Sequence, residues 1–492
     1  MSDAPQNLGR VAAGGILWTS ASQGVRQLLQ IAVTAALARQ LAPEDFGLLG
    51  MAGVALAFLA PLNELGMGAA LVQKKDLAPA HATAVFWAQV GLASAVALIL
   101  AVAAPLFAGF FRRPELVPLL RAMCVSLPLS AAASAPLALL TRALRFRRIA
   151  AVETASLALG GALGVGLALA GWGVWSLVGQ AVSSSAATAV LLLPGSGLRL
   201  LARPSRAHLR DLLRFSAPLT AYQGLNFLSR NLDDVLVGRF LGAGPLGFYQ
   251  LAYRVMMYPL QKVSDVVGRV TFPALAAMQD DPARMRQAYL RTVRYIALVT
   301  LPMMAVVSVA APELIAVLFG PAWAPVAPLV IVLSFAGMAG SIGTTVGSLF
   351  LARGRSGLML RWEILACACY AAAIVLGLRR GLLGVAVAYT TMSFALWPVS
   401  HWVANRLIGL RMREFFRALA PQAVLAAALA GALLSIKLAW APTGVAQQAA
   451  FLLTCGTVAT GTLLLAVRLK RPAAAGEAAA LLREALGQRG AR

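Results

Sequence analysis

A few ionisable and amide side chains interrupt otherwise apolar stretches of this sequence, and they recur at helical spacing. In the stretch 14–38, Gln23, Arg26 and Gln30 are three and four residues apart, which places them on one face of a helix. Guanidinium and ammonium groups bind phosphate or diphosphate, whereas amides and carboxylates bind sugar hydroxyls. The candidates for ligand contact in the polar stretches are Arg26, Gln30, Glu64, Asn226, Arg230, Arg254, Tyr258 and Lys262.

Acidic residues occur in the same stretches and indicate a second kind of chemistry. A carboxylate in a partly dehydrated site can exchange a bound proton or sodium ion for a salt bridge with a neighbouring cation. Asp233, Asp234 and Asp265 are therefore candidates for ion coupling, and Asp234 is the first of them because it lies one helical turn from Arg230. The alternative is that these acids only pair with cations, as Lys262 with Asp265 would.

Membrane-spanning helices must position these side chains. Hydrophobic residues make up 60% of the 492 and charged residues only 12%, too little polar surface for a soluble protein of this length. Apolar stretches recur that can each cross a hydrocarbon core of about 30 Å, and they are too long and continuous for barrel strands. We place the helices at 14–38, 46–72, 83–108, 116–140, 149–170, 173–194, 212–240, 246–272, 293–316, 325–351, 358–378, 383–405, 417–438 and 447–467. The sequence thus predicts an all-α polytopic membrane protein with about fourteen transmembrane helices.

The distribution of cations predicts the orientation of these helices. With the N-terminus in the cytoplasm, 30 of the 42 lysines and arginines fall on the inner side and seven on the outer side. This bias favours cytoplasmic termini. The first helix is expected to be retained in the bacterial inner membrane, because Gln23, Arg26, Gln27 and Gln30 lie where a cleaved signal peptide would be purely apolar. The net charge of +24 is then mainly a topology signal, which argues against nucleic acid as a partner.

The sequence also repeats itself. The segment Arg39–Gly47 matches Arg239–Gly247, and Gly173 matches Gly384. Helix 1 then corresponds to helix 7 and helix 6 to helix 12. Because six is an even number, the halves share one orientation and are related by a pseudo-two-fold axis along the membrane normal. The expected domains are 1–195, an N-terminal six-helix bundle; 196–211, a cytoplasmic linker; 212–407, a C-terminal six-helix bundle; 408–468, helices 13 and 14; and 469–492, a basic cytoplasmic tail. The polar helices 1, 2, 7 and 8 would line a central cavity.

Several kinds of catalytic site are absent from the sequence. No lysine follows a glycine, so there is no P-loop, and His81, His208 and His401 are too scattered to suggest a metal site. The predicted outer loops are too short to hold the polar groups of a membrane polymerase or ligase. We therefore expect no enzyme activity, no catalytic residue, no metal and no cofactor, apart from a coupling proton or sodium ion.

Several of these segments carry a family resemblance. They are Leu17–Gln40, Phe46–Leu49, Asn63–Gln73, Asp233–Gly242, Leu246–Tyr249 and Phe272–Pro273. Over about residues 10–465 the chain resembles the Wzx-type polysaccharide flippases of the MOP superfamily, in the lipopolysaccharide and colanic-acid exporter branch. The resemblance implies two six-helix bundles plus a terminal helix pair, alternating access by rocking, and a central cavity formed by helices 1, 2, 7 and 8.

The expected function is export of undecaprenyl-diphosphate-linked oligosaccharide repeat units for surface polysaccharide, that is O-antigen, capsule or exopolysaccharide. The partners would be this lipid-linked substrate and membrane lipids, with a polysaccharide polymerase and chain-length machinery as candidate protein partners. Two alternatives stay open: a drug or small-metabolite antiporter of the same superfamily, and a membrane polymerase or ligase, which the short loops disfavour.

Overall fold

The chain folds into long helices in a computed structural model that describes residues 23–64, 71, 79–198 and 231–469. Among these residues, ten helical segments are long and apolar enough to cross a membrane. The all-α membrane architecture is confirmed, while the count of fourteen spans stays a prediction. Contacts divide the chain into two compact units, Met1–Gln250 (unit 1) and Leu251–Arg492 (unit 2). The predicted domain boundaries rest on the repeat and stay predictions.

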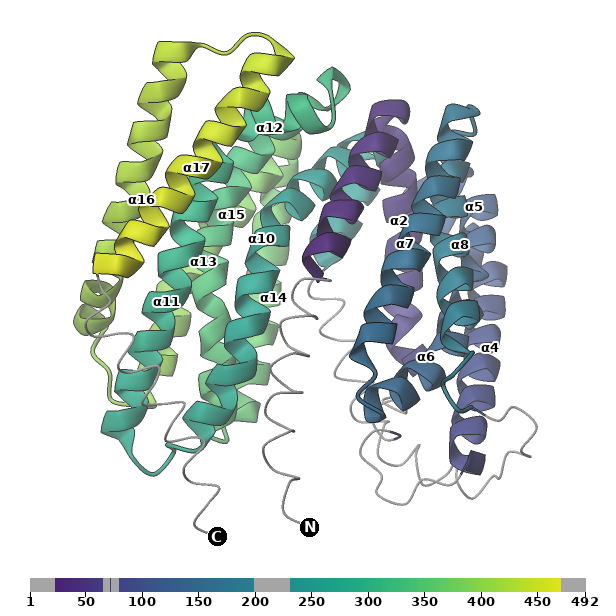
Figure 1. Ribbon diagram of the computed structural model, residues 1–492, viewed down its shortest axis with the longest axis horizontal. Helices are drawn as coiled ribbons and strands as arrows, with labels where there is room; N and C mark the ends of the chain where they lie inside the picture. Colours follow the sequence, from purple (N-terminus) through teal and green to yellow (C-terminus); the bar gives the residue numbers. More distant parts are fainter. Residues whose placement is uncertain (1–22, 65–70, 72–78, 199–230, 470–492) are drawn as a thin grey trace. The chain divides into compact units, whose positions relative to one another are not determined.

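The described residues of unit 1 form a series of helices and helical segments that ends in the first turns of α10 (Figure 1). They are residues 23–40, α2 (Pro43–Glu64), α4 (Pro79–Phe111), α5 (Leu116–Cys124), α6 (Ser126–Arg142), α7 (Phe146–Leu169), α8 (Trp175–Leu192), residues 231–241, and α10 (Ala243–Ala276) up to Gln250. Helices α7 and α8 pack so closely that a Cβ atom at Gly160 would lie 1.9 Å from Ser184 Oγ. Small residues allow such close approach between membrane helices.

The span predicted at 116–140 is divided into α5 and α6 at Val125. Pro128 explains the division. A proline has no backbone N–H to donate to the carbonyl four residues earlier, and its ring crowds that carbonyl. The carbonyl four residues before Pro128 belongs to Cys124, the last residue of α5. The two helices together still form one membrane-spanning segment.

Unit 2 begins within α10 and continues through the C-terminal helices. They are α11 (Pro282–Val309), α12 (Ala311–Leu318), the 3-10 turn η1 (Pro321–Trp323), α13 (Val326–Ala352), α14 (Ser356–Leu378), α15 (Gly381–Arg406), α16 (Met412–Trp440) and α17 (Val445–Leu469). The fully buried side chains of Tyr289, Phe350 and Phe415 lie in one core that joins α11, α13 and α16. The terminal pair packs on the same unit, α16 along α11 and α17 along α12 (Figure 1).

The span predicted at 293–316 is wrong at both ends. Helix α11 starts at Pro282, because the Asp281 carboxylate accepts hydrogen bonds from the N–H groups of Ala283 (3.1 Å) and Arg284 (3.0 Å) and so caps the helix. The sequence prediction began this helix too late, because its first turns are polar and the prediction relied on apolar stretches. The other end is Val309, where Pro312 interrupts the hydrogen-bond ladder and starts α12.

The repeated segments meet each other where α2 crosses the first turns of α10. A Cβ atom at Gly47 would lie 1.7 Å from the Ala243 carbonyl oxygen, and one at Gly247 would lie 2.0 Å from the Pro43 carbonyl oxygen. Gly47 and Gly247 are equivalent in the repeat, and so are Pro43 and Ala243. The contact is therefore reciprocal, as a pseudo-two-fold relation requires.

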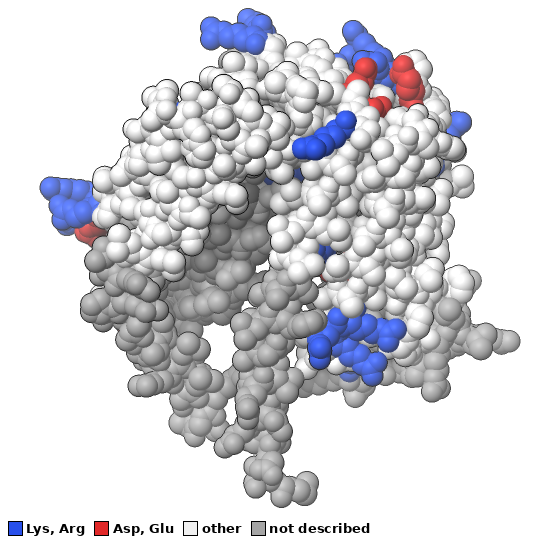
Figure 2. Space-filling model, turned by 45° about the horizontal axis from the view of Figure 1, so that its top comes forward, with Lys and Arg blue, Asp and Glu red and all other residues white. Residues whose placement is uncertain are grey.

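Charged side chains occupy a small part of the described surface. In Figure 2 most of the described surface in view is uncharged, and lysine and arginine side chains form a few separate groups on it. This pattern fits helices that face hydrocarbon along most of their length. The cytoplasmic location of both termini stays a prediction.

Candidate substrate and ion sites

Arg26 forms an ion pair across two helices of unit 1. Its guanidinium Nη1 donates to Glu153 Oε2 of α7, and the two side chains are 40% and 37% exposed. Glu153 belongs to a helix that is long and apolar enough to cross a membrane, where an isolated charge is unfavourable, and Arg26 supplies the partner that it needs. Both side chains therefore retain surface that no described part of the chain covers.

The packing of helix 23–40 on α7 and α8 sets this pair. Leu37 and Val33 of the helix bury against Ala168 and Leu177. A Cβ atom at Gly161 would lie 2.5 Å from Val33 Cγ2. Val33 and Gly161 lie about two turns beyond Arg26 and Glu153 on their helices, so the two helices run parallel and in register from the ion pair onward.

Gln30 lies one turn from Arg26 on the same helix, as the spacing predicted. Its Nε2 donates to Thr34 Oγ1 at 3.3 Å, so part of its hydrogen-bonding capacity is used within the helix. The neighbouring Gln27 has a buried Nε2 atom with no hydrogen-bond partner among the described residues. The side-chain amides of Gln27 and Gln30 thus lie near Arg26 on the same helix.

The two adjacent aspartates have separate partners on α10. Asp233 is 7% exposed and accepts a hydrogen bond from the Tyr249 hydroxyl at 2.9 Å. Its other oxygen accepts the Asp234 backbone N–H at 3.0 Å, while Asp234 Oδ2 accepts from Gln250 Nε2 at 2.9 Å. The turn at Gly242, whose φ is +94°, brings α10 back alongside helix 231–241 and creates both contacts.

The remaining candidates divide between described and undescribed positions. Arg254 is exposed and Tyr258 half-buried, one turn apart on α10 in unit 2. Glu64 is the last residue of α2, and Lys262 and Asp265 belong to α10, but their side chains lie outside the description. Asn226 and Arg230 lie outside the described residues altogether, so the proximity of Arg230 to Asp234 stays a prediction.

The structure therefore resolves the candidates of unit 1 into two local groups, Arg26 with Glu153 and the aspartates with Tyr249 and Gln250. The sequence reasoning did not select these three partners. A signal for Glu153 was present, because it is the only acid in α7 and a lone intramembrane carboxylate calls for a cation. A signal for Tyr249 and Gln250 was present as well, because a glycine turn at Gly242 folds the chain back on itself. Tyr249 follows Asp233 by the same number of residues as Gln250 follows Asp234.

The described residues contain no group of three or more histidine, cysteine, aspartate or glutamate side chains arranged to hold a metal ion. His81 and His401 are buried at separate places, in α4 and α15. What this arrangement offers is therefore ionic and hydrogen-bonding contact: a half-exposed guanidinium paired with a carboxylate, amides beside it, and a buried carboxylate held by a phenol.

The sequence matches known polysaccharide proteins over most of its length. Residues 36–328 match the family model described as "Polysaccharide biosynthesis protein". The chain is 27% identical to the lipopolysaccharide biosynthesis protein WzxC of Escherichia coli (strain K12), over 82% of this chain and 83% of that protein. It is 26% identical to the teichuronic acid biosynthesis protein TuaB of Bacillus subtilis (strain 168), over 84% and 86%. It is also 33% identical to the succinoglycan biosynthesis transport protein ExoT of Rhizobium meliloti (strain 1021), over 58% of each.

Solved structures show the same fold. The lipid II flippase MurJ in an inward closed conformation aligns with a TM-score of 0.72 and 12% identity, covering 92% of this chain and 99% of that one. An inward-facing multidrug resistance MATE family transporter of the MOP superfamily aligns with a TM-score of 0.64 and 16% identity, covering 80% and 98%. These likenesses establish the architecture. This chain belongs to the polysaccharide biosynthesis protein family, in the Wzx-type branch of the MOP superfamily that its sequence motifs indicated.

Proposed function

We propose that this protein is a flippase that moves undecaprenyl-diphosphate-linked oligosaccharide repeat units across the bacterial inner membrane by alternating access. The observation that carries the proposal is the match over most of the chain to WzxC and TuaB. WzxC, TuaB and ExoT are named for the biosynthesis of three different polysaccharides. What such exporters can share is a lipid-linked intermediate, whose diphosphate and hydroxyls are the same kinds of group whichever sugar is attached.

The Arg26 pair supports a role in binding the diphosphate. A guanidinium matches phosphate oxygens in a bidentate geometry. Glu153 pairs with Arg26, and a diphosphate would offer the same guanidinium a similar set of acceptors. Arg230, Arg254 and Lys262 would supply further positive charge in the same role.

We further propose that transport is coupled to a proton or sodium gradient through Asp233, Asp234 or Asp265. Asp233 accepts a hydrogen bond from Tyr249, and Asp234 accepts one from Gln250. Such a carboxylate can take up a proton or an ion without losing its position. An ion that binds one cavity orientation more tightly than the other shifts the conformational equilibrium by the difference in affinity.

No covalent step belongs to this function, so the protein would act as a transporter and not as an enzyme. Its partners would be the lipid-linked saccharide, membrane lipids, and the polymerase and chain-length machinery that use the product. Both termini would lie in the cytoplasm.

The test is to delete the gene and analyse lipid-linked intermediates. We expect an undecaprenyl-linked oligosaccharide to accumulate on the cytoplasmic face, and the purified protein in liposomes to move the fluorescently labelled intermediate between leaflets. A drug or small-metabolite antiporter would leave the lipid-linked pool unchanged in the deletion strain. If that pool is unchanged and the liposomes show no translocation, the proposal is wrong.

A further inference from the structure

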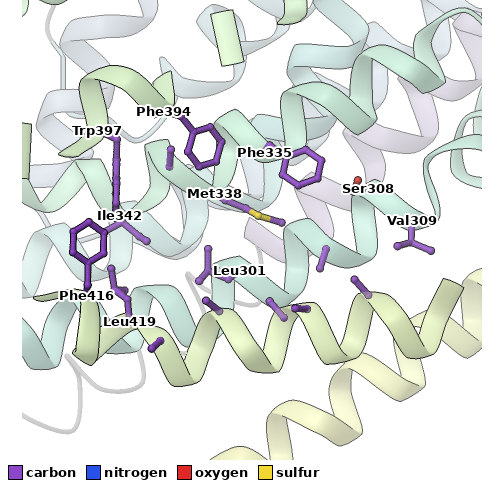
Figure 3. Close-up of a pocket in the computed structure, with 17 residues that line it drawn as sticks. Leu301, Ser308, Val309, Phe335, Met338, Ile342, Phe394, Trp397, Phe416 and Leu419 are labelled. Atoms are coloured by element: carbon purple, nitrogen blue, oxygen red, sulfur yellow. The ribbon is translucent and has the colours of Figure 1, made fainter. Parts of the chain in front are cut away.

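Four helices of unit 2 enclose a long apolar cavity that the proposed transport step does not use. Its volume is about 660 Å³. Its walls come from α11, α13, α15 and α16, and all but one of the seventeen lining residues are aliphatic or aromatic, Ser308 being the exception (Figure 3). The cavity is therefore suited to a hydrocarbon chain.

The shape of the cavity is a slot along α16. Helix α16 contributes small side chains, chiefly alanines such as Ala423, Ala427 and Ala430, whereas α13 and α15 contribute the rings of Phe335 and Phe394 (Figure 3). From Phe416 to Ala430 the helix rises about 21 Å, at ~1.5 Å per residue. One leaflet of a hydrocarbon core of about 30 Å is about 15 Å deep, so the slot is long enough for the chain of a lipid in one leaflet.

The slot is open along its side. Phe335, Phe394 and Phe416 line it and are 45%, 47% and 47% exposed in the described structure. Water has almost no polar partner inside, and apolar cavities of this kind stay dry. Protein interiors do not leave voids of this size empty when a flexible apolar chain can reach them. A hydrocarbon chain from the bilayer can enter sideways and fill the slot.

Cations lie at one end of the slot. Arg413 precedes Phe416 by three residues, so it lies on the same face of α16, one turn before the apolar lining begins. It is exposed and has no ion-pair partner among the described residues, and Arg417 lies one turn further on and is also exposed. In the predicted orientation this end of α16 reaches the cytoplasmic surface, where anionic head groups are found.

We propose that the slot binds one acyl chain of an anionic phospholipid from the cytoplasmic leaflet, with its phosphate at Arg413 and Arg417. The lipid would fill the space between α16 and the rest of unit 2 and so hold the terminal helix pair in place. This inference is independent of the transport function, because a bound lipid can be measured without any translocation.

The test is native mass spectrometry of the full-length protein purified from membranes in mild detergent, together with lipid extraction. We expect one equivalent of anionic phospholipid to be retained. Ala427→Trp fills the slot and should lower retention by about tenfold or more, which corresponds to ~1.4 kcal/mol. The matched control is Val424→Trp, which adds a similar volume on the same helix at a 67% exposed position and should retain the lipid.

A second variant keeps the slot open and tests the head group. Arg413→Ala should lower the preference for anionic over zwitterionic phospholipid by about fivefold, the equivalent of ~1 kcal/mol for one cation near the membrane surface. Equal retention in wild type and Ala427→Trp, with no effect of Arg413→Ala, would overturn the proposal. Recovery of a polyprenyl phosphate in place of a phospholipid would overturn it as well.

Discussion

Arg26 and Glu153 show how single charges are accommodated in this protein. Each occupies a largely apolar helix, and the two helices are brought together by packing at Val33 and Gly161 rather than by the charges themselves. Mutations of these two residues can therefore distinguish a role of the ion pair in helix packing from a role in ligand binding. The aspartates can be tested in the same way, because their partners Tyr249 and Gln250 are uncharged.

The first prediction concerns Arg26. A hydrogen bond to a charged group contributes about 1.5–3 kcal/mol, so Arg26→Ala should lower polysaccharide export by about 10- to 100-fold while the protein level in the membrane is unchanged. Glu153→Gln keeps the cation and a hydrogen-bond acceptor and should export normally. The measurement is complementation of a deletion strain, with immunoblotting of membranes.

The charge-reversed double variant Arg26→Glu with Glu153→Arg is the control for this prediction. It restores an ion pair between the same helices but moves the cation to α7. We expect it to fold and insert without exporting. Normal export by this variant would show that the pair has only a packing role.

The second prediction concerns ion coupling. Asp234→Asn keeps an acceptor for Gln250 Nε2 but cannot take up a proton or compensate a sodium ion, so the liposome flipping rate should no longer respond to either gradient. Gln250→Met removes the same hydrogen bond without changing the charge and should leave the response intact. Headgroup translocation with and without each gradient is the assay. A wild-type protein that ignores both gradients, with a normally active Asp234→Asn variant, would contradict the coupling.

At the scale of elements, two close contacts determine how helices meet. One is the reciprocal crossing of α2 and α10 at Gly47 and Gly247, where there is no room for a Cβ atom. The other is where α11 ends: Lys437 Nζ of α16 donates to the free carbonyl of Val309 at 3.0 Å and pairs with Glu313 of α12 at 3.0 Å. The second contact connects the terminal helix pair to the break that Pro312 creates.

The third prediction tests the crossing. Gly47→Ala places a methyl group against the Ala243 backbone, and overpacking of this kind costs about 1–3 kcal/mol. We expect a lower melting temperature in detergent and reduced export. Gly53→Ala lies on the same helix with nothing within 4 Å and should be neutral or stabilising by up to ~1 kcal/mol, because alanine favours helix. Similar melting temperatures for the two variants would show that α2 and α10 can separate without loss.

The fourth prediction tests the Lys437 contact. Glu313 is only 5% exposed, so Lys437→Met leaves a buried carboxylate without its cation, and breaking a buried pair costs about 3–5 kcal/mol. The double variant Lys437→Met with Glu313→Gln removes both charges and should be more stable than Lys437→Met alone. A thermal double-mutant cycle in detergent measures the coupling. If the two substitutions are simply additive, the ion pair does not stabilise this junction.

At the scale of the whole molecule, the distribution of cations along the sequence predicts the orientation in the membrane. Most lysines and arginines fall in the loops and flanks on the predicted inner side, and the apolar stretches between them carry few charges. A helix bundle with this pattern inserts with its cationic loops in the cytoplasm.

The fifth prediction is this orientation. Single cysteines introduced near Arg145, Arg206, Arg286 and Arg411, on a background from which the four native cysteines have been removed, should resist membrane-impermeant maleimides in intact cells. They should react after the cells are permeabilised. A cysteine near Arg112, in a predicted outer loop, provides the positive control. Labelling of any of the four inner positions in intact cells would refute the predicted topology.

The sequence by itself determined the class of the protein and most of its helices. Three signals were local or statistical: the length of the apolar stretches, the bias of arginine toward the predicted inner side, and the repeat of Arg39–Gly47 at Arg239–Gly247. Each can be read without knowing which residues are in contact. The division at Val125 was also present in the sequence, as Pro128, although the apolar run across it concealed the break. The family was also recognisable from the sequence, because short motifs are local signals that need no knowledge of contacts.

Only the tertiary structure decided which side chains meet. Glu153 lies 127 residues from Arg26, and helical spacing carries no information about a partner so distant in the chain. The same holds for Lys437 and Glu313, and for the slot whose lining comes from four helices. Periodicity determines which face of a helix a residue occupies, but the neighbour on that face depends on how helices pack, and in membranes packing follows from small residues and shape.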